Sequence, residues 1–387
     1  MMFKKVFNVS LVAALLVSAN VSAQEYTTLS VEEKRIPKAK QAMPKVTSAF
    51  DERVKGFAEQ VKLARSYTTL TQLVIRHGDG LWRDAVLQFE QAGKSDDRAL
   101  YWARLKMSKA LKASGPFNEL FPMQQEKLLW KLELLTRGKQ DVKFNKKADK
   151  KILITGFDPF FLDRNIGQSN PSGVAALALD DLFITSDGRS AEIESLIIPV
   201  RFKDFDEGMI EELLTPYLKD VDMIATISMG RSDFDLERFP GLRRSAQAPD
   251  NLNVHTGASS KNPIIPLLRG ERLDGPEFVK FSLPVDAMST ARGPYKINDN
   301  HKITTLEGDR EPKTLSELQG QISVQGAGGG YLSNEISYRS ILLRDALNPS
   351  LPVGHIHTPR INGYEPGKSK AIVEQIKQML TKSIGSI

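Results

Sequence analysis

The chain of 387 residues contains no cysteine. This absence excludes disulfide bonds, thiolate zinc sites and a cysteine nucleophile. It also fits an exported protein, in which a free thiol would face oxidation or wrong pairing. Histidine is scarce too: of the five residues, only His355 and His357 are close in the sequence, and no carboxylate accompanies them at a ligand spacing. We therefore expect neither a metal ion nor another cofactor.

The chain also lacks a strong charge of one sign. Its 53 lysine and arginine residues against 47 aspartate and glutamate residues give a formal net charge of +6. No basic stripe with interleaved aromatic residues occurs, so we expect no nucleic-acid partner. The hydrophobic content of 41% is ordinary for a globular protein, and the length predicts about two domains.

The apolar run near the N-terminus is too short to span a bilayer, which needs about 20 apolar residues. It stands between a lysine pair and a small-residue motif: Lys4 and Lys5, the run over 9–17, and Val21-Ser22-Ala23. This order predicts a secretory signal peptide over residues 1–23, cleaved before Gln24. We expect an exported protein of the bacterial periplasm, without a stable membrane anchor after cleavage. An uncleaved anchor and an apolar first strand are the alternatives.

Residues 24–149 carry apolar side chains at helical spacing and predict an all-α domain. Helices are expected around 54–61, 81–89, 100–111 and 128–135, the last of them ended by Gly138. No catalytic constellation occurs here, so a small bundle or a cap on the second domain is expected. A lysine-rich segment over 143–151 indicates an exposed linker, with a nucleic-acid patch as the alternative.

Residues 151–387 alternate strand and helix patterns, which predicts an α/β domain with helices on both faces of the sheet. Strands are expected at 151–155, 195–200, 222–229, 279–284, 321–325 and 353–358, and helices at 171–183, 206–218, 331–346 and 367–383. Residues 258–313 are rich in proline, glycine and charge and are expected to include surface loops. The expected fold class is a three-layer α/β/α sandwich with a mostly parallel or mixed sheet, preceded by an all-α domain.

Four blocks of the second domain occur in an order that resembles pyroglutamyl peptidase I (pyrrolidone-carboxylate peptidase). They are 155–160 with 170–172, then 230–231 with 236–238 and 249–251, then 331–334 with Tyr338, and finally 355–359. The resemblance covers essentially all of 151–387, whereas the N-terminal region lies outside it. It implies the fold of that family and a hydrolase site built on a Cys-His-Glu arrangement.

By this resemblance His357 matches the family's histidine and Glu237 its acid, while Ser333 stands at the position of the nucleophilic cysteine. In such a site the nucleophile attacks an amide carbonyl, the histidine moves the proton, and the carboxylate orients the histidine. Phe157 and Phe160 match the aromatic residues that sandwich the lactam ring of pyroglutamate. Two phenyl faces suit a small planar amide.

Two further positions depart from the family. Gln247 stands where the family has an arginine that is thought to help stabilise the oxyanion, so a hydrogen bond is kept but a charge is lost. Phe161 stands where the family usually has glycine, which could crowd the pocket. The helix start expected near Tyr331 would lower the pKa of a cysteine, but it does much less for the hydroxyl of Ser333.

The sequence thus predicts an exported hydrolase that removes N-terminal pyroglutamate, or a related small acyl group, from peptides through Ser333, His357 and Glu237. It leaves activity itself open. A catalytically silent module that binds a peptide or pyroglutamate, and a hydrolase of an unrelated substrate, are the alternatives.

Overall fold

The computed structural model describes residues 26–92 and 96–387. The predicted signal peptide therefore lies outside the described residues. Within the part of the chain that is described, no helix is both long and apolar enough to cross a membrane.

The N-terminal region is helical, as the sequence predicts. Its helices are α2 (Val31–Lys34), α3 (Ile36–Ala42), α4 (Pro44–Thr47), α5 (Asp51–Leu63), α6 (Tyr67–Ala92), α7 (Arg98–Lys112), α8 (Gly115–Asn118) and α9 (Pro122–Leu135). The four longest, α5, α6, α7 and α9, are the four that apolar periodicity predicts, because each buries one face against the others. After α9 the chain turns at Gly138, whose φ of +94° lies in the region that favours glycine.

The second region is built on a seven-stranded sheet in the order β2-β3-β1-β4-β12-β5-β8. These strands are β1 (Lys150–Phe157), β2 (Leu182–Ser186), β3 (Arg189–Ile198), β4 (Met223–Met229), β5 (Phe234–Glu237), β8 (Ile297–Asn300) and β12 (Val353–Thr358). The pairs β1–β3, β1–β4, β4–β12 and β5–β8 are parallel, whereas β2–β3 and β5–β12 are antiparallel. The central strands are covered on both faces and are buried along their length, as parallel strands generally are.

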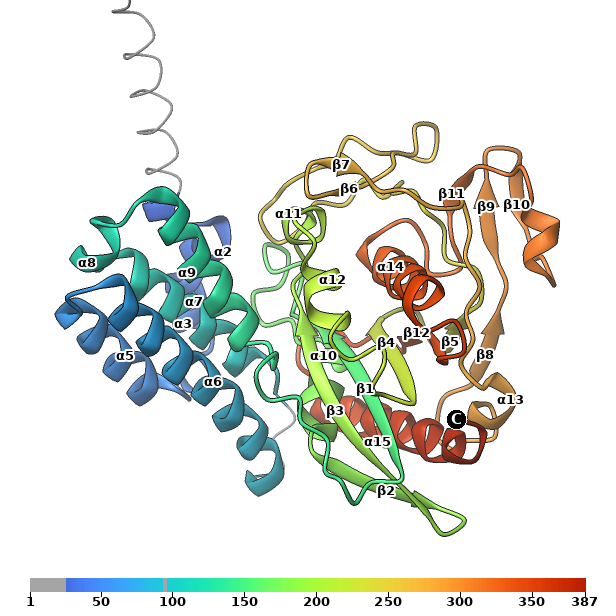
Figure 1. Ribbon diagram of the computed structural model, residues 1–387, viewed down its shortest axis with the longest axis horizontal. Helices are drawn as coiled ribbons and strands as arrows, with labels where there is room; N and C mark the ends of the chain where they lie inside the picture. Colours follow the sequence, from blue (N-terminus) through green and yellow to red (C-terminus); the bar gives the residue numbers. More distant parts are fainter. Residues whose placement is uncertain (1–25, 93–95) are drawn as a thin grey trace, which may run out of the picture.

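Helices pack on both faces of this sheet (Figure 1). On one side α10 (Pro171–Leu179) packs on β1, β3 and β4, and α15 (Pro366–Ser383) packs against α10 and α13 (Val285–Met288). On the other side α14 (Leu332–Leu347) packs on β4 and β12 and contacts α12 (Met209–Leu214), which follows α11 (Phe202–Asp206). The predicted α/β/α sandwich preceded by helices is therefore confirmed.

The remaining elements are short. They are the hairpin β6 (Leu267–Leu268) and β7 (Glu271–Arg272), the separate sheet of β9 (Ile303–Thr305), β10 (Gly308–Arg310) and β11 (Ser323–Gln325), and two 3-10 turns, η1 (Leu315–Leu318) and η2 (Ile384–Ser386). The strand expected at 321–325 is thus real, but it belongs to this small sheet.

Two local predictions are wrong. Residues 279–284 form no strand, because their backbone N–H groups bond to different partners, Phe281 to Arg238 and Ser282 to Val353. The helix expected to reach 183 ends at Leu179, and an edge strand, β2, follows at once. The segment expected to include surface loops also supplies β8, whose sequence Ile-Asn-Asp-Asn has no apolar alternation because it lies at the edge of the sheet.

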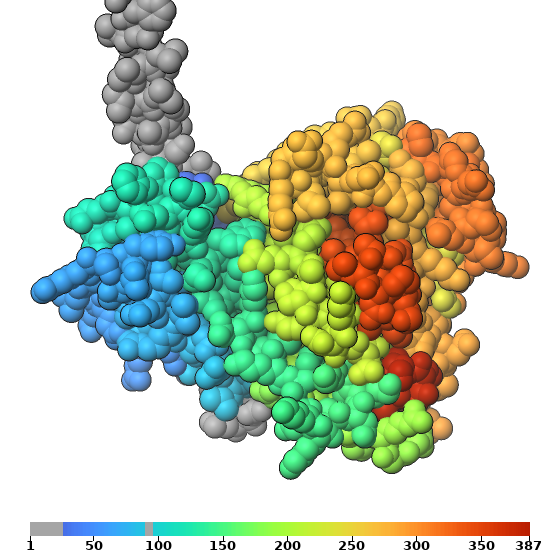
Figure 2. All heavy atoms as spheres, in the orientation of Figure 1, coloured from blue at the N-terminus to red at the C-terminus, as the bar shows by residue number. Residues whose placement is uncertain are grey.

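The helical region packs closely on the sheet region, and the space-filling view shows the two in contact along their length (Figure 2). Four side chains of α10 and β3 belong to the hydrophobic core of the helices: Val174, Ala176, Leu177 and Ile197. Two buried arginines of the helical region, Arg104 and Arg137, pair with Asp158 directly after β1. Of the predicted exposed linker over 143–151, Lys143, Lys146 and Lys147 are exposed, whereas Lys150 and Lys151 are half-buried at the start of β1. The boundary between two independent domains stays a prediction.

Candidate functional site

A buried histidine–carboxylate pair joins two neighbouring strands at the centre of the site. Nδ1 of His357, on β12, lies 2.5 Å from Oε1 of Glu237, at the end of the adjacent strand β5. Glu237 has no exposed surface, and its second oxygen accepts a hydrogen bond of 2.6 Å from Asn300 on β8. Burial raises the pKa of the Glu237 carboxyl, and the neighbouring imidazole opposes that effect. The pair fixes the imidazole through Nδ1 and leaves Nε2 for chemistry.

The second histidine of this strand has a structural role. Nδ1 of His355 lies 2.8 Å from the hydroxyl of Thr226, and its Nε2 lies 2.8 Å from the hydroxyl of Ser228. Complete burial lowers the pKa of His355 well below its usual value, so the ring is neutral. Its ring meets that of His357 edge-on, with centroids 4.9 Å apart. Both nitrogens of His355 are thus engaged by hydroxyl groups, and the ring supports its neighbour by packing.

Ser333 lies in the first turn of α14, where the helix reaches the sheet. Its hydroxyl is half-buried and donates a hydrogen bond of 3.2 Å to the carbonyl of Gly328, in the glycine-rich turn before the helix. Within the described chain no hydrogen bond joins Ser333 to His357. Ser333 would have to turn its hydroxyl away from Gly328 to use that histidine as a base.

Ser333 lines a small pocket of about 40 Å³ together with both predicted phenylalanines. The lining residues are Phe157, Phe160, Asn170, Val200, Ser228, Met229, Tyr331, Leu332 and Ser333. His357 is adjacent, because it is the register partner of Ser228 on the neighbouring strand and cross-strand partners share one face of a sheet. Glycine at position 230 leaves room for His357, since a Cβ there would lie 2.7 Å from Cβ of His357. The structure thus brings together Ser333, both phenylalanines and, beside them, the His357–Glu237 pair.

The two positions that depart from the resembled family lie away from the pocket lining. The side chain of Gln247 is exposed, and the main-chain carbonyl of this residue accepts a hydrogen bond of 3.1 Å from Nδ1 of His255. Phe161 has a φ of +61°, the backbone region that favours glycine, and its ring centroid lies 4.4 Å from that of Phe160. Phe161 is not among the residues that line the pocket.

The loop between β1 and α10, residues 158–170, carries Phe160 and is called the pocket loop. Hydrogen bonds from residues to which the sequence analysis assigned no role hold this loop in place. Asn170 caps α10 through Ser172 and donates a hydrogen bond of 3.0 Å to the carbonyl of Asp158. Asn251 donates one of 2.9 Å to the carbonyl of Pro159. Asn170 and Asn251 both lie in the sequence blocks that resemble pyroglutamyl peptidase I, so the resemblance could have indicated a role for them. Asn300, by contrast, belongs to the segment expected to include surface loops and carried no signal.

Comparisons with known proteins agree with this arrangement of two regions. A family model described as "PA0049 N-terminal domain" matches residues 16–133, and one described as "PA0049, C-terminal domain" matches residues 151–274 and 295–362. The uncharacterized protein PA0049 of Pseudomonas aeruginosa is 31% identical in an alignment 396 residues long, which covers 78% of this chain and 72% of that protein.

The second region is also similar in sequence to peptidases. A pyrrolidone-carboxylate peptidase of Streptococcus suis is 25% identical over 240 residues, which is 61% of this chain and 92% of the peptidase. Among solved structures, pyrrolidone carboxyl peptidase from Pyrococcus furiosus covers 61% of this chain and 99% of its own, at 22% identity and a TM-score of 0.41. Pyroglutamyl peptidase I from Bacillus amyloliquefaciens covers 61% and 97%, at 20% identity and a TM-score of 0.40. Because both PA0049 models match and the Pseudomonas relative is similar along most of its length, the chain belongs to the PA0049 family.

Proposed function

We propose that this protein is a peptidase-like hydrolase that removes N-terminal pyroglutamate, or a related small acyl group, from peptides. One observation carries the proposal: Ser333 and the two phenylalanines Phe157 and Phe160 line the same pocket, next to the buried His357–Glu237 pair. The sequence similarity to pyrrolidone-carboxylate peptidases supports a substrate of this class.

In the proposed reaction the hydroxyl of Ser333 attacks the carbonyl carbon of the scissile amide, and Nε2 of His357 accepts its proton. Glu237 holds Nδ1 and stabilises the imidazolium that forms. His357 then gives the proton to the departing amine, which leaves an ester between the acyl group and Ser333. Water, deprotonated by His357, hydrolyses this ester. The unpaired N–H groups of the first turn of α14 are the candidate donors to the oxyanion.

A silent binding module is the second candidate, and two observations favour it. The hydroxyl of Ser333 is bonded to Gly328, and Gln247 supplies no charge to the pocket. A hydrolase of an unrelated substrate is the third candidate. If the protein is an active hydrolase, replacement of the family's arginine by Gln247 should make it slow, because the loss of one donor to the oxyanion costs about 10²–10³ in rate.

The deciding experiment measures release of aminomethylcoumarin from its pyroglutamyl conjugate by the purified protein. The wild type should release it, and Ser333→Ala and His357→Ala should each remove nearly all turnover. The double variant should be little worse than either, because such residues act as a unit. Ser337→Ala is the matched control: this serine lies one helical turn further along α14, is fully buried, and its hydroxyl has no hydrogen-bond partner.

Ser333→Cys separates the candidates further. A thiol at a helix start beside a histidine should form a reactive thiolate, so this variant should gain activity that iodoacetamide abolishes. Failure of both wild type and Ser333→Cys on the conjugate, with pyroglutamate still bound, would establish the silent module. If neither variant binds or hydrolyses such a ligand, the substrate class must be abandoned.

We also propose that the protein is exported and that its leader is removed after Ala23. The motif of two lysines, a short apolar run and small residues supports this proposal. Mass spectrometry of the exported protein should find an N-terminus at Gln24. An exported protein that retains Met1 would contradict it.

A further inference from the structure

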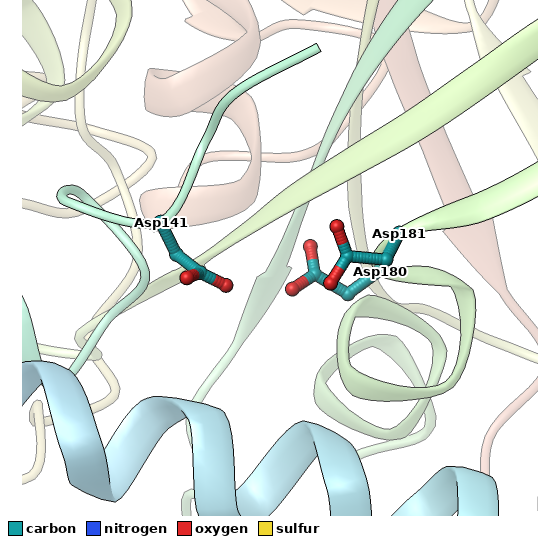
Figure 3. A group of neighbouring side chains, drawn as sticks. All are labelled: Asp141, Asp180 and Asp181. Carbon is teal, nitrogen blue, oxygen red and sulfur yellow. The ribbon is translucent and has the colours of Figure 1, made fainter. Parts of the chain in front are cut away.

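Five carboxylates gather where the segment after α9 meets the edge of the main sheet. Asp141 comes from that segment, Asp180 and Asp181 from the turn between α10 and β2, and Glu192 and Glu194 from β3. Figure 3 shows the carboxylate of Asp141 opposite those of Asp180 and Asp181. Two sets of three, Asp141-Asp180-Asp181 and Asp181-Glu192-Glu194, each offer carboxylate oxygens that lie within 4.8 Å of one another.

The backbone places these groups for local reasons. Glu192 and Glu194 are two residues apart on a strand, so their side chains point to the same face of the sheet. Asp181 has a φ of +59°, which turns the chain sharply between α10 and β2. Residues 141, 180–181 and 192–194 are far apart in the sequence, so only the fold brings the carboxylates together.

Hydrogen-bond donors reach part of this acidic cluster. The indole N–H of Trp82 is shared between Asp141, at 3.1 Å, and Asp180, at 3.2 Å. Nε of Arg83 lies 3.2 Å from Asp141, but the same guanidinium also pairs with Asp79. Backbone N–H groups reach two more of the carboxylates: Ser195 donates a hydrogen bond of 2.7 Å to Asp180, and Asn145 donates one to Glu192.

Glu194 is the independent observation that points to a ligand. Glu194 is 1% exposed, and among the described residues no donor meets hydrogen-bond geometry at either of its carboxylate oxygens, although the backbone of Lys143 is close enough to interact with the carboxylate. A buried carboxylate without a donor is costly, and either a proton or a cation must compensate it.

We propose that this acidic cluster binds Ca²⁺ and thereby fastens the segment after α9 to the edge of the sheet. Ca²⁺ accepts six to eight oxygen ligands at about 2.3–2.6 Å in a flexible geometry. Such a flexible shell suits carboxylates that come from separate segments of the chain and lie close together without a fixed arrangement. Mg²⁺ requires shorter bonds, of about 2.0–2.1 Å, in a rigid octahedron. Zn²⁺ prefers nitrogen and sulfur ligands, and the cluster contains only carboxylates.

Binding is tested on the full mature protein after treatment with a chelator. Terbium, a luminescent substitute for Ca²⁺, should emit on excitation of tryptophan, because the indole of Trp82 contacts two of the ligands. Added Ca²⁺ should compete with terbium, and saturating Ca²⁺ should raise Tm by about 3 °C or more. A wild type with no emission and no change in Tm overturns the proposal.

Glu194→Gln is the decisive variant, because it keeps the shape of a protonated Glu194 and removes its charge. It should lose the Ca²⁺-dependent rise in Tm without a fall in the Tm measured in chelator. Asp187→Asn is the matched control and should respond as the wild type does, since Asp187 is exposed in the β2–β3 turn with a φ of +50° that asparagine tolerates. If Glu194→Gln does not fold, Asp181→Asn serves the same purpose.

Proteolysis gives an independent readout of the proposed fastening. Ca²⁺ should slow cleavage by a lysine-specific protease at Lys143, Lys146 and Lys147 in the wild type, and it should have no such effect in Glu194→Gln. Equal responses of the wild type and Glu194→Gln to Ca²⁺ would place the cation elsewhere and overturn the proposal. An equal rise in Tm with Mg²⁺ would overturn its assignment to Ca²⁺.

Discussion

Asp158 joins the helical region to the pocket loop, and its replacement by asparagine tests whether the two regions depend on each other. Nη1 of Arg104 lies 2.8 Å from Oδ1 and 3.0 Å from Oδ2 of Asp158, and Nη1 of Arg137 lies 2.7 Å from Oδ2. The three side chains are 1%, 2% and 3% exposed for Arg104, Arg137 and Asp158 respectively. Asparagine keeps the shape of Asp158 but removes the charge that both guanidinium groups face.

The cost follows from what the two arginines retain. Arg137 keeps its ion pair with Glu133, whereas Arg104 keeps only the hydroxyl and the carbonyl of Thr136. Breaking a buried ion pair by removing one partner costs about 3–5 kcal/mol, because the other charge stays buried without compensation. We expect Asp158→Asn to lower the free energy of unfolding by about 3 kcal/mol, mainly at Arg104.

Urea unfolding followed by circular dichroism measures this change. Glu307→Gln is the control, since it breaks the exposed pair with Arg310, whose side chains are 63% and 41% exposed. Exposed pairs contribute at most about 1 kcal/mol. In a double-mutant cycle, Arg104→Met combined with Asp158→Asn should cost less than the sum of the two single changes, because the single changes each leave a charge unpaired. A loss below about 1 kcal/mol for Asp158→Asn, or simple additivity, would refute the reasoning.

Three further predictions follow from single sites. Burial raises the pKa of the Asp97 carboxyl to about 7, so the folded state binds this proton more tightly than the unfolded state does. The free energy of unfolding should therefore be highest at acidic pH and should fall as the pH rises toward 7. Urea midpoints of Asp97→Asn between pH 4.5 and 8 should therefore fall less steeply with pH than those of the wild type; parallel curves would contradict this. Gly230→Ala should reduce turnover of the pyroglutamyl conjugate at least about tenfold, because the added methyl would lie 2.7 Å from Cβ of His357 and displaces this residue; full activity would show that the histidine has room. Gly138→Ala should lower Tm more than Gly188→Ala. Both glycines have a positive φ, but a Cβ at Gly138 would lie 2.8 Å from the nearest atoms, whereas a Cβ at Gly188 would meet nothing within 4 Å. Equal losses of Tm would show that backbone strain alone causes both.

Much of the fold was predictable because long elements carry their own pattern. The helices α5, α6, α7 and α9 each show an apolar face, and β1, β4 and β12 show short buried runs between turn signals. The elements that were missed are those whose environment determines them. The edge strand β8 is polar, and residues 279–284 have a strand-like composition, but their N–H groups bond to separate partners, Arg238 and Val353, and form no ladder with one strand.

In the candidate site, too, some residues were predictable from the sequence and others were not. The resemblance assigned Ser333, His357 and Glu237, and the structure places Ser333 in the pocket lining and the His357–Glu237 pair beside it. It could not assign Asn300, which holds the second oxygen of Glu237, because the element that carries it has no pattern of its own. Nor could it show that the hydroxyl of Ser333 bonds to Gly328, since a rotamer depends on the neighbours that the fold supplies.

The sequence by itself determined the absence of thiol chemistry, the succession of helices and alternating strands, and the residue types at the candidate site. These properties are local or compositional, so they can be read along the chain. The tertiary structure alone decided which distant charges meet: Arg104 with Asp158, and Glu194 with the other carboxylates of the acidic cluster. Ionic contacts between segments far apart in the sequence leave no periodic trace, because burial and distance, which set their strength, exist only after the chain has folded.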